Sequence, residues 1–172
     1  FECNNQLGGL FRSRIGKQSI IMSDRHSVVV DLIKQLLKTK SHINILEVGC
    51  SSGVFLTELL SGLESENLSK QVTMTGIDID EDAVKKSVSS QVELIYCSVE
   101  EFCKLNSNKY DLVLHFELIE HLSDPFLFMR SVSQLLCSGG KTHFTTPNAD
   151  GFDNVALGYN DFRPIAHGIF PP

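Results

Sequence analysis

The stretch that decides the fold runs over residues 43–60, INILEVGCSSGVFLTELL. Its first six residues, 43–48, are mostly β-branched or apolar, as in a strand that is buried on both faces. The apolar residues of 54–60 recur at helical spacing. Gly49 and Gly53 bracket the turn between them, where glycine permits a tight bend and a close approach of the backbone to a ligand. This stretch therefore predicts a strand–turn–helix unit.

The alternation of strand and helix patterns continues on both sides of this unit. Strands are predicted over 72–78, 92–96, 111–116 and 141–146. Helices are predicted over 28–38, from Glu81 onward and from a start at Pro125, with the apolar stripe of the last helix over 126–137 and a turn at 138–140. Strands that alternate with helices form a parallel sheet with helices on both faces. We therefore expect an α/β fold that is truncated after its fifth strand, because the remaining residues look like loop.

Length and composition fit one globular domain. The chain has 172 residues, of which 42% are hydrophobic and 21% charged, and these values exclude a disordered chain, a collagen-like repeat and a coiled coil. The domain is predicted over residues 28–150, between an N-terminal segment (1–27) and a loop-like tail (151–172). A net charge of −6 disfavours RNA and anionic lipid as partners.

The cysteine pattern and the hydropathy of the sequence indicate the cellular compartment of the protein. The chain has five cysteines, an odd number without a CxxC pair, which is typical of reduced thiols. No apolar run approaches the ~20 residues that a membrane helix needs, and no signal peptide is visible. We expect a cytoplasmic protein, and the sequence leaves its oligomeric state open.

The glycine turn is the strongest candidate for a ligand site. Its spacing, Gly49-x-x-x-Gly53, matches neither the phosphate-binding GxxxxGK[ST] loop nor the dinucleotide GxGxxG fingerprint, which disfavours ATP and NAD. The helix start near Gly53 suits an anionic group, and Glu47 can accept hydrogen bonds from an ammonium group. Asp78 ends the next strand, where an acid can bind both ribose hydroxyls. The alternatives are a turn without a ligand and, for Asp78, a helix N-cap, although Asp80 is better placed for that. The pattern points to a nucleoside-containing ligand.

Four segments in series resemble the class I S-adenosylmethionine-dependent methyltransferases. They are residues 47–53, similar to the (E/D)xGxGxG cofactor loop, 76–78, similar to the acidic second motif, 110–113, similar to the strand-four motif, and 135–148, similar to the LLkPGG…TPN segment. The likeness covers residues 43–150. It implies a Rossmann-like, mostly parallel sheet and methyl transfer from S-adenosylmethionine.

The resemblance also implies which residues bind the cofactor. They are Glu47, Gly49, Cys50 and Gly53 at the methionine end, Asp78 at the ribose, Ile79, Ser98 and Val99 at the adenine, and His115 and Phe116 near the sulfonium. The chain departs from the family pattern at two positions. Ser51 replaces the middle glycine of the loop, which is tolerable if its φ is negative, and Ser98 replaces a common aspartate.

Residues 117–122, ELIEHL, form a second candidate cluster. Glu117, Glu120 and His121 converge if this segment is helical or tightly turned, and such a donor set suits Mg²⁺, Mn²⁺ or Zn²⁺. ExxEH resembles the ubiquinone-pathway O-methyltransferases and the small-RNA 3′-end 2′-O-methyltransferases, in which these residues bind a metal with a later histidine, here His167. Two alternatives stay open: His121 acts with Glu120 as a general base without a metal, or the group only shapes the pocket.

Several aromatic residues are predicted as core rather than as site residues. They are His143 on the fifth predicted strand and the phenylalanines Phe126, Phe128 and Phe144.

Together, these patterns predict methyl transfer to an oxygen of a small molecule such as a phenol, a quinone precursor, a fatty acid or a sugar. The alternatives are an RNA 2′-O-methyltransferase, a catalytically silent cofactor-binding protein and a nucleotide-dependent oxidoreductase on a similar sheet.

Overall fold

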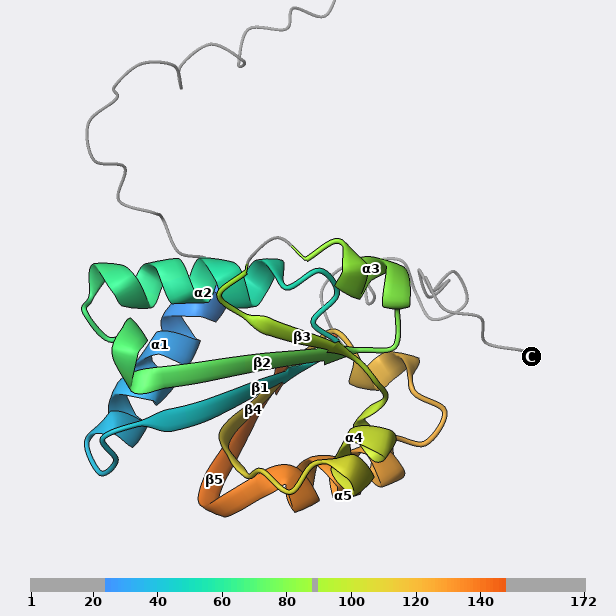
Figure 1. Ribbon diagram of the computed structural model, residues 1–172. Coiled ribbons are helices and arrows are strands. Elements are labelled where there is room, and N and C mark those ends of the chain that lie inside the picture. The colour runs from blue at the N-terminus through green and yellow to red at the C-terminus, as the bar shows by residue number, and fades with distance from the viewer. Residues whose placement is uncertain (1–23, 88–89, 148–172) are drawn as a thin grey trace, which may run out of the picture.

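The computed structural model describes residues 24–87 and 90–147 (Figure 1). These residues form a five-stranded sheet in the order β3-β2-β1-β4-β5, in which every neighbouring pair of strands is parallel. The strands are β1 (Ile43–Val48), β2 (Val72–Asp78), β3 (Glu93–Tyr96), β4 (Tyr110–Phe116) and β5 (Leu136–Thr145). The predicted Rossmann-like α/β fold is confirmed.

Helices cover both faces of the sheet. They are α1 (Asp24–Leu37), α2 (Val54–Ser65), α3 (Glu81–Lys85), α4 (Val99–Leu105) and α5 (Pro125–Leu135), with short 3₁₀ turns η1 (Ser69–Gln71) and η2 (Ile119–His121). α1 and α2 pack on one face, and α4 and α5 on the other (Figure 1). None of the helices in the described part of the chain is long and apolar enough to cross a membrane.

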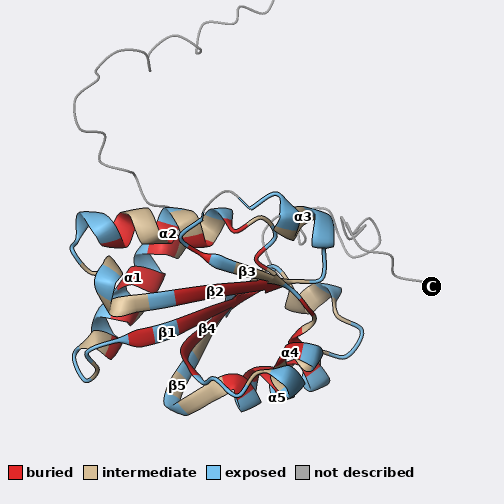
Figure 2. Cartoon of the chain, in the orientation of Figure 1, coloured by how far each residue is buried: buried red, intermediate tan, exposed pale blue. Residues whose placement is uncertain are grey.

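Strand β1 lies at the centre of the sheet and explains why residues 43–48 are so apolar. Successive side chains of a strand point to opposite faces. Ile43 and Ile45 belong to the core under α1 and α2, whereas Leu46 and Val48 belong to the core under α4 and α5. Figure 2 shows this buried centre, with the exposed residues on the outer sides of the helices. Burial on two faces replaces the alternating pattern of a half-exposed strand.

The largest differences between the observed and the predicted element boundaries concern the last helix, β5 and the start of α1. The last helix ends at Leu135 instead of Cys137, and β5 then begins at once, so that it includes the predicted turn at 138–140. This extension is possible because Leu136 pairs with Tyr110, and the pairing resumes at Leu112 and Lys141, so that the glycine-containing segment of β5 bulges between these two pairs. Helix α4 was not predicted, and α1 starts at Asp24, before the predicted domain start at residue 28. The predicted end at residue 150 lies outside the described residues.

Two of the three phenylalanines predicted as core are exposed. Phe128 is buried with Val132 and Leu135, at the spacing of one helix face. Phe126 lies outside that stripe and is 84% exposed. Phe144 is 40% exposed, because β5 lies at the edge of the described sheet. The core prediction is therefore wrong for Phe126 and Phe144.

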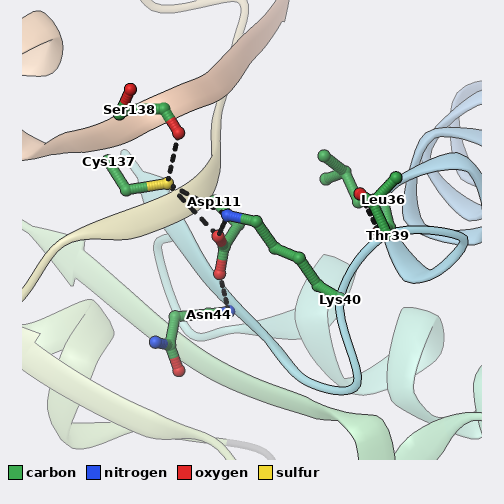
Figure 3. A network of polar contacts seen from close by, with 7 residues as sticks. All are labelled: Leu36, Thr39, Lys40, Asn44, Asp111, Cys137 and Ser138. Atoms are coloured by element: carbon green, nitrogen blue, oxygen red, sulfur yellow. Dashed lines mark hydrogen bonds and ion pairs between the residues drawn. The ribbon is translucent and has the colours of Figure 1, made fainter.

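A polar network joins the amino ends of β1, β4 and β5 (Figure 3). Asp111 accepts hydrogen bonds from the Asn44 backbone N–H at 2.7 Å, from the Cys137 thiol at 3.2 Å and from the Lys40 ammonium. Burial by itself raises the pKa of the Asp111 carboxyl, but these three donors outweigh burial and hold the pKa below its ordinary value. The network links three segments that are distant in sequence, at the end of the sheet opposite Asp78.

Replacement of Asp111 with alanine is expected to destabilise the fold by about 2–3 kcal/mol and to lower the Tm by about 5–10 °C. Because the folded pKa of Asp111 is lowered, its contribution is fully present above the unfolded value of ~3.9 and is lost as the pH falls through the folded pKa. Urea unfolding at pH 7 and pH 3 checks this, with the exposed Asp31→Ala on α1 as the control. Equal losses in both variants, or a loss that does not change with pH, would contradict the assignment.

Candidate functional site

A cavity of about 490 Å³ lies at the carboxyl ends of the strands. Its walls come from the ends of β1, β2 and β4, the start of α4, the segment after β4 and the first turns of α5. The chain leaves β1 toward β2 on one side, and β4 lies on the other side, so this is where the strand order reverses. Open α/β sheets bind ligands at such switch points. The cavity is therefore the candidate ligand site.

The glycine loop forms one edge of the cavity, and both predicted glycines are needed by its geometry. Gly49 has a φ of 79°, and a Cβ there would lie 3.1 Å from Leu118 Cδ2. Gly53 has a φ of 77° and precedes α2, and a Cβ there would lie 2.9 Å from Leu94 Cδ1. Both positions have the left-handed conformation that favours glycine. Gly49 lines the cavity. Gly53 does not line it and is instead required by the turn before α2.

Asp78 ties this loop to the end of β2. Its carboxylate accepts hydrogen bonds from the Ser51 backbone N–H at 2.6 Å and from the Asp80 backbone N–H at 2.8 Å. Ser51 has a φ of 50°, so the condition of a negative φ is not met, and the bond to Asp78 helps to hold this conformation. As predicted, Asp80 is the N-cap of α3, with a bond from the Ala83 N–H at 3.0 Å. Each Asp78 oxygen accepts one of these bonds and retains a lone pair at the cavity wall.

Glu47 lies behind the loop, on the α1 and α2 face of the sheet. It is only 4% exposed, and its Oε2 has no hydrogen-bond partner among the described residues. Burial raises the pKa of Glu47 to about 8; Arg25 opposes this rise, and Asp78 adds to it. Since buried carboxylates normally have partners, an unpartnered oxygen here points to a missing donor. Glu47 does not itself line the cavity.

Cys50 is part of the loop but faces inward. Its Cβ and Sγ would lie under 3 Å from a Cβ at Gly76, so the thiol fills the space beside that glycine. Burial, with the nearby carboxylates Glu47 and Asp78, raises the pKa of Cys50 to about 12. The four described cysteines are free thiols, and Cys3 lies outside the described residues. A thiol this hard to ionise is not a nucleophile.

The residues predicted at the adenine end all line the cavity. Ile79 is 74% exposed at the rim, Ser98 is the N-cap of α4, and Val99 is buried below it. The Ser98 hydroxyl accepts a hydrogen bond from the Glu101 backbone N–H at 3.2 Å and keeps its own proton for donation. An exposed isoleucine at a cavity rim provides an apolar surface for a flat ligand.

The two residues at the end of β4 differ in their position. Phe116 lines the cavity, but His115 does not. His115 is fully buried between Phe144, whose ring stacks on it at 4.7 Å, and Phe128, whose ring meets it edge-on at 5.0 Å. Burial, followed by the nearby His143, lowers the pKa of His115 to about 4, so it is neutral at physiological pH. Half-buried His143 meets the Phe116 ring edge-on at 6.0 Å.

Glu117 begins the tight turn after β4, with a φ of 47°. Its Oε1 accepts a hydrogen bond from the Thr145 hydroxyl at 2.6 Å, and its backbone N–H donates to the Thr145 carbonyl at 2.9 Å. Arg25 lies 3.7 Å from the same carboxylate, and its guanidinium sits 4.7 Å above the Phe116 ring. Glu117 is thus held by partners from α1 and β5, and it lines the cavity.

Glu120 and His121 follow on η2. The Glu120 carboxylate accepts a hydrogen bond from the Thr146 hydroxyl at 3.1 Å, and its other oxygen lies 3.9 Å from His121 Nε2. The segment is tightly turned, yet within residues 24–87 and 90–147 no three His, Cys, Asp or Glu side chains gather as a metal site. His167, the predicted fourth ligand, lies outside the described residues. The described donors therefore do not fit a divalent metal, and we derive no step through one.

Several residues that line the cavity escaped the sequence prediction. Among them are Glu100, Leu118, Leu122, Ser123, Asp124 and Leu127. Most follow β4, in a segment whose local pattern suggested chemistry at 117–121 but not a cavity wall. Arg25 was also missed as a site residue, because its partners Glu117 and Phe116 are distant in sequence.

The fold and the cavity define a Rossmann-like α/β protein with a ligand site at the switch point of its sheet. Residues 22–171 match a protein family described as a methyltransferase domain. The chain belongs to this family, and the resemblance to class I S-adenosylmethionine-dependent methyltransferases is confirmed.

Curated relatives cover the same region. The ubiquinone biosynthesis O-methyltransferase of Escherichia coli O7:K1 (strain IAI39 / ExPEC) is 29% identical over 114 residues, which are 62% of this chain and 44% of the relative. The enzyme of the same name from Citrobacter koseri (strain ATCC BAA-895 / CDC 4225-83 / SGSC4696) is 28% identical over 114 residues, 62% and 43% of the two chains. The chain thus spans less than half the length of these relatives.

Solved structures share the fold. The plantazolicin methyltransferase BpumL, in complex with a triazolic desmethylPZN analog and SAH, aligns with a TM-score of 0.62 and 18% identity over 82% of this chain and 51% of that one. The CurJ carbon methyltransferase aligns with a TM-score of 0.57 and 17% identity over 69% and 34%. At these identities the likeness shows a common fold.

Proposed function

We propose that the protein transfers the methyl group of S-adenosylmethionine to an oxygen atom of a small-molecule acceptor. The observation that carries this proposal is the cavity at the switch point, with Asp78 in its wall and, behind its loop, Glu47, whose Oε2 has no hydrogen-bond partner among the described residues. The donor class follows from the family. The oxygen acceptor is supported by the relatives, which are O-methyltransferases by name.

The residues around the cavity match the parts of the cofactor. Glu47 would hold the ammonium group of the methionine end, because no donor in the described part of the chain reaches its buried Oε2. The free lone pairs of Asp78 would accept bonds from the two ribose hydroxyls, and Ile79 would lie against the adenine. When bound, the cofactor supplies a methyl group on a positively charged sulfur. The chain's part is to fix that methyl group in line with the acceptor.

The charge of the cavity lining distinguishes between the possible methyl acceptors. The cavity is lined by four carboxylate residues, Asp78, Glu100, Glu117 and Asp124, and by no lysine, arginine or histidine of the described chain. This negative potential favours the cationic methyl donor. It also repels the phosphates of RNA, whose binding depends on basic side chains. A neutral or weakly charged small molecule therefore fits the site better than RNA.

Proton removal is the second requirement, because a hydroxyl acceptor must lose its proton to attack the methyl group. His121 lies on η2, between the cavity-lining Leu118 and Leu122, and Glu120 lies 3.9 Å from its Nε2. We assign His121 as the general base and Glu120 as the residue that orients it and stabilises the imidazolium. No metal is required by this arrangement.

A labelled-methyl assay tests the proposal. The protein is incubated with methyl-labelled S-adenosylmethionine and, separately, a phenol, a fatty acid, a primary amine and a single-stranded RNA, after S-adenosylhomocysteine (SAH) binding is confirmed by thermal shift. We expect label on the oxygen of a small acceptor. Label on RNA or on the amine alone would contradict the acceptor class. SAH binding without any transfer would instead indicate a catalytically silent protein.

The pH dependence of SAH binding reports on Glu47. Its pKa of about 8 keeps the carboxyl protonated at lower pH, so pairing with the ammonium group of SAH must release a proton. The affinity should then rise with pH, by up to about tenfold per unit, and level off above about pH 8. Calorimetry in buffers of different ionisation enthalpy measures the released proton. Glu47→Gln should lose this pH dependence, and an identical profile in that variant would refute the role.

A further inference from the structure

A second hollow lies on the α4 side of the sheet, along the edge strand β3. It has a volume of about 580 Å³ and is lined by residues of β3, of α4 and of the loop that leads from α4 to β4. Figure 1 shows where these elements lie. Its floor includes Thr75 of β2 and Tyr110 of β4. None of the residues assigned above to the glycine loop, the ribose or the acceptor lines this hollow.

The hollow combines aromatic rings with carboxylates. Tyr96 contributes an exposed ring to its lining, Phe102 and Tyr110 contribute buried rings, and Glu93 of β3 and Glu101 of α4 contribute carboxylates. No described lysine, arginine or histidine lines it. Carboxylates attract a cation through charge, and the faces of aromatic rings attract it as well. An organic cation that carries an aromatic ring can contact the carboxylates with its charge and the aromatic side chains with its ring.

The wall that the buried Tyr110 contributes to the hollow is fixed by hydrogen bonds. The Asn106 amide donates to the Tyr110 hydroxyl at 3.2 Å, and the same hydroxyl has a hydrogen bond to Thr75. Tyr110 is buried, and the Phe102 ring packs 6.3 Å from its ring. A wall held in this way is already formed before a ligand binds, as is usual for small-molecule sites.

We infer that this hollow is a second ligand site, which binds a small organic cation with an aromatic ring. It is separate from the cofactor cavity, but Cys97 lines both. Helix α4 is also shared, since Val99 faces the cofactor cavity and Phe102 faces the hollow. The ligand would therefore lie directly behind the adenine end of the cofactor cavity.

The test uses phenethylammonium as the probe and 3-phenylpropanoate as a control of similar shape and opposite charge. Binding to the full chain is followed by ¹H–¹⁵N NMR with SAH at saturation, so that the cofactor cavity is filled. We expect millimolar binding of the cation with shifts at Tyr96, Glu101 and Asn106, and binding of the anion weaker by roughly tenfold or more.

Variants distinguish binding in the hollow from non-specific attraction of the cation to the negatively charged protein. The double variant Glu93→Gln/Glu101→Gln should weaken binding of the cation by roughly tenfold, whereas Glu64→Gln, an exposed site on α2, should leave it unchanged. Equal binding of cation and anion, unchanged binding in the double variant, or shifts confined to Asp78 and Asp124 would overturn the inference. Failure of SAH to bind would contradict the proposed function, but the shifts would still show whether the cation occupies the hollow.

Discussion

Replacement of His121 with alanine is expected to lower methyl transfer by roughly 10²–10⁴-fold, the usual contribution of a general base. Affinity for SAH should stay close to that of the parent protein, because His121 lies on η2 and does not line the cofactor cavity. The measurement is a single-turnover transfer assay with the best acceptor of the panel, together with calorimetric titration of SAH. A loss confined to the transfer step is the signature of a catalytic group rather than of cofactor binding.

Two further variants sharpen this result. Glu120→Gln keeps the bond to the Thr146 hydroxyl but removes the charge beside the imidazole, so it should reduce transfer, although less than His121→Ala does. His42→Ala, at an exposed histidine before β1, should change neither quantity. Transfer that survives in His121→Ala would refute the general-base role and leave the group as part of the pocket wall.

The parts of the fold that were predicted correctly are determined by residues that lie close together in the sequence. Residues 43–60 encode their strand–turn–helix unit through two-sided burial and a glycine turn, and Asp80 caps α3 through a bond three residues away. The start of β5 was not predictable in this way. Leu136 joins a strand because it pairs with Tyr110, a partner far away in sequence, although the glycines that follow it look like a turn. Pairing across the sheet overrides the local signal.

In the candidate site, too, the features that follow from the local sequence were predicted, whereas those that depend on partners distant in sequence were not. The loop glycines and Asp78 stand at the ends of predicted strands, so topology alone brings them to one edge of the sheet. The partners of Glu117 and Glu120 come from β5 and the residue after it, and no spacing within ELIEHL reveals that threonine hydroxyls hold the two carboxylates. His115 was placed near the sulfonium by resemblance, whereas its place on β4 turns it toward α5 and the aromatic core.

Asp78→Asn is expected to weaken SAH binding by about 100-fold or more. Hydrogen bonds to a charged acceptor contribute about 1.5–3 kcal/mol each, and two ribose hydroxyls would depend on this carboxylate. The amide offers only one acceptor oxygen, so its NH₂ group must face either the Ser51 or the Asp80 backbone N–H, where a donor meets a donor. The variant should therefore lose the ribose contact and, in addition, loosen either the glycine loop at Ser51 or the start of α3 at Asp80.

Calorimetric titration of SAH measures the loss, and adenosine, titrated separately, distinguishes its two causes. Adenosine lacks the methionine end but keeps the ribose, so its affinity should fall together with that of SAH if Asp78 binds the ribose. Asp82→Asn, in the first turn of α3 and away from the cavity, is the matched control and should bind SAH like the parent protein. If Asp78→Asn weakened SAH binding but left adenosine binding intact, Asp78 would serve only to hold the loop, and the ribose would have another partner.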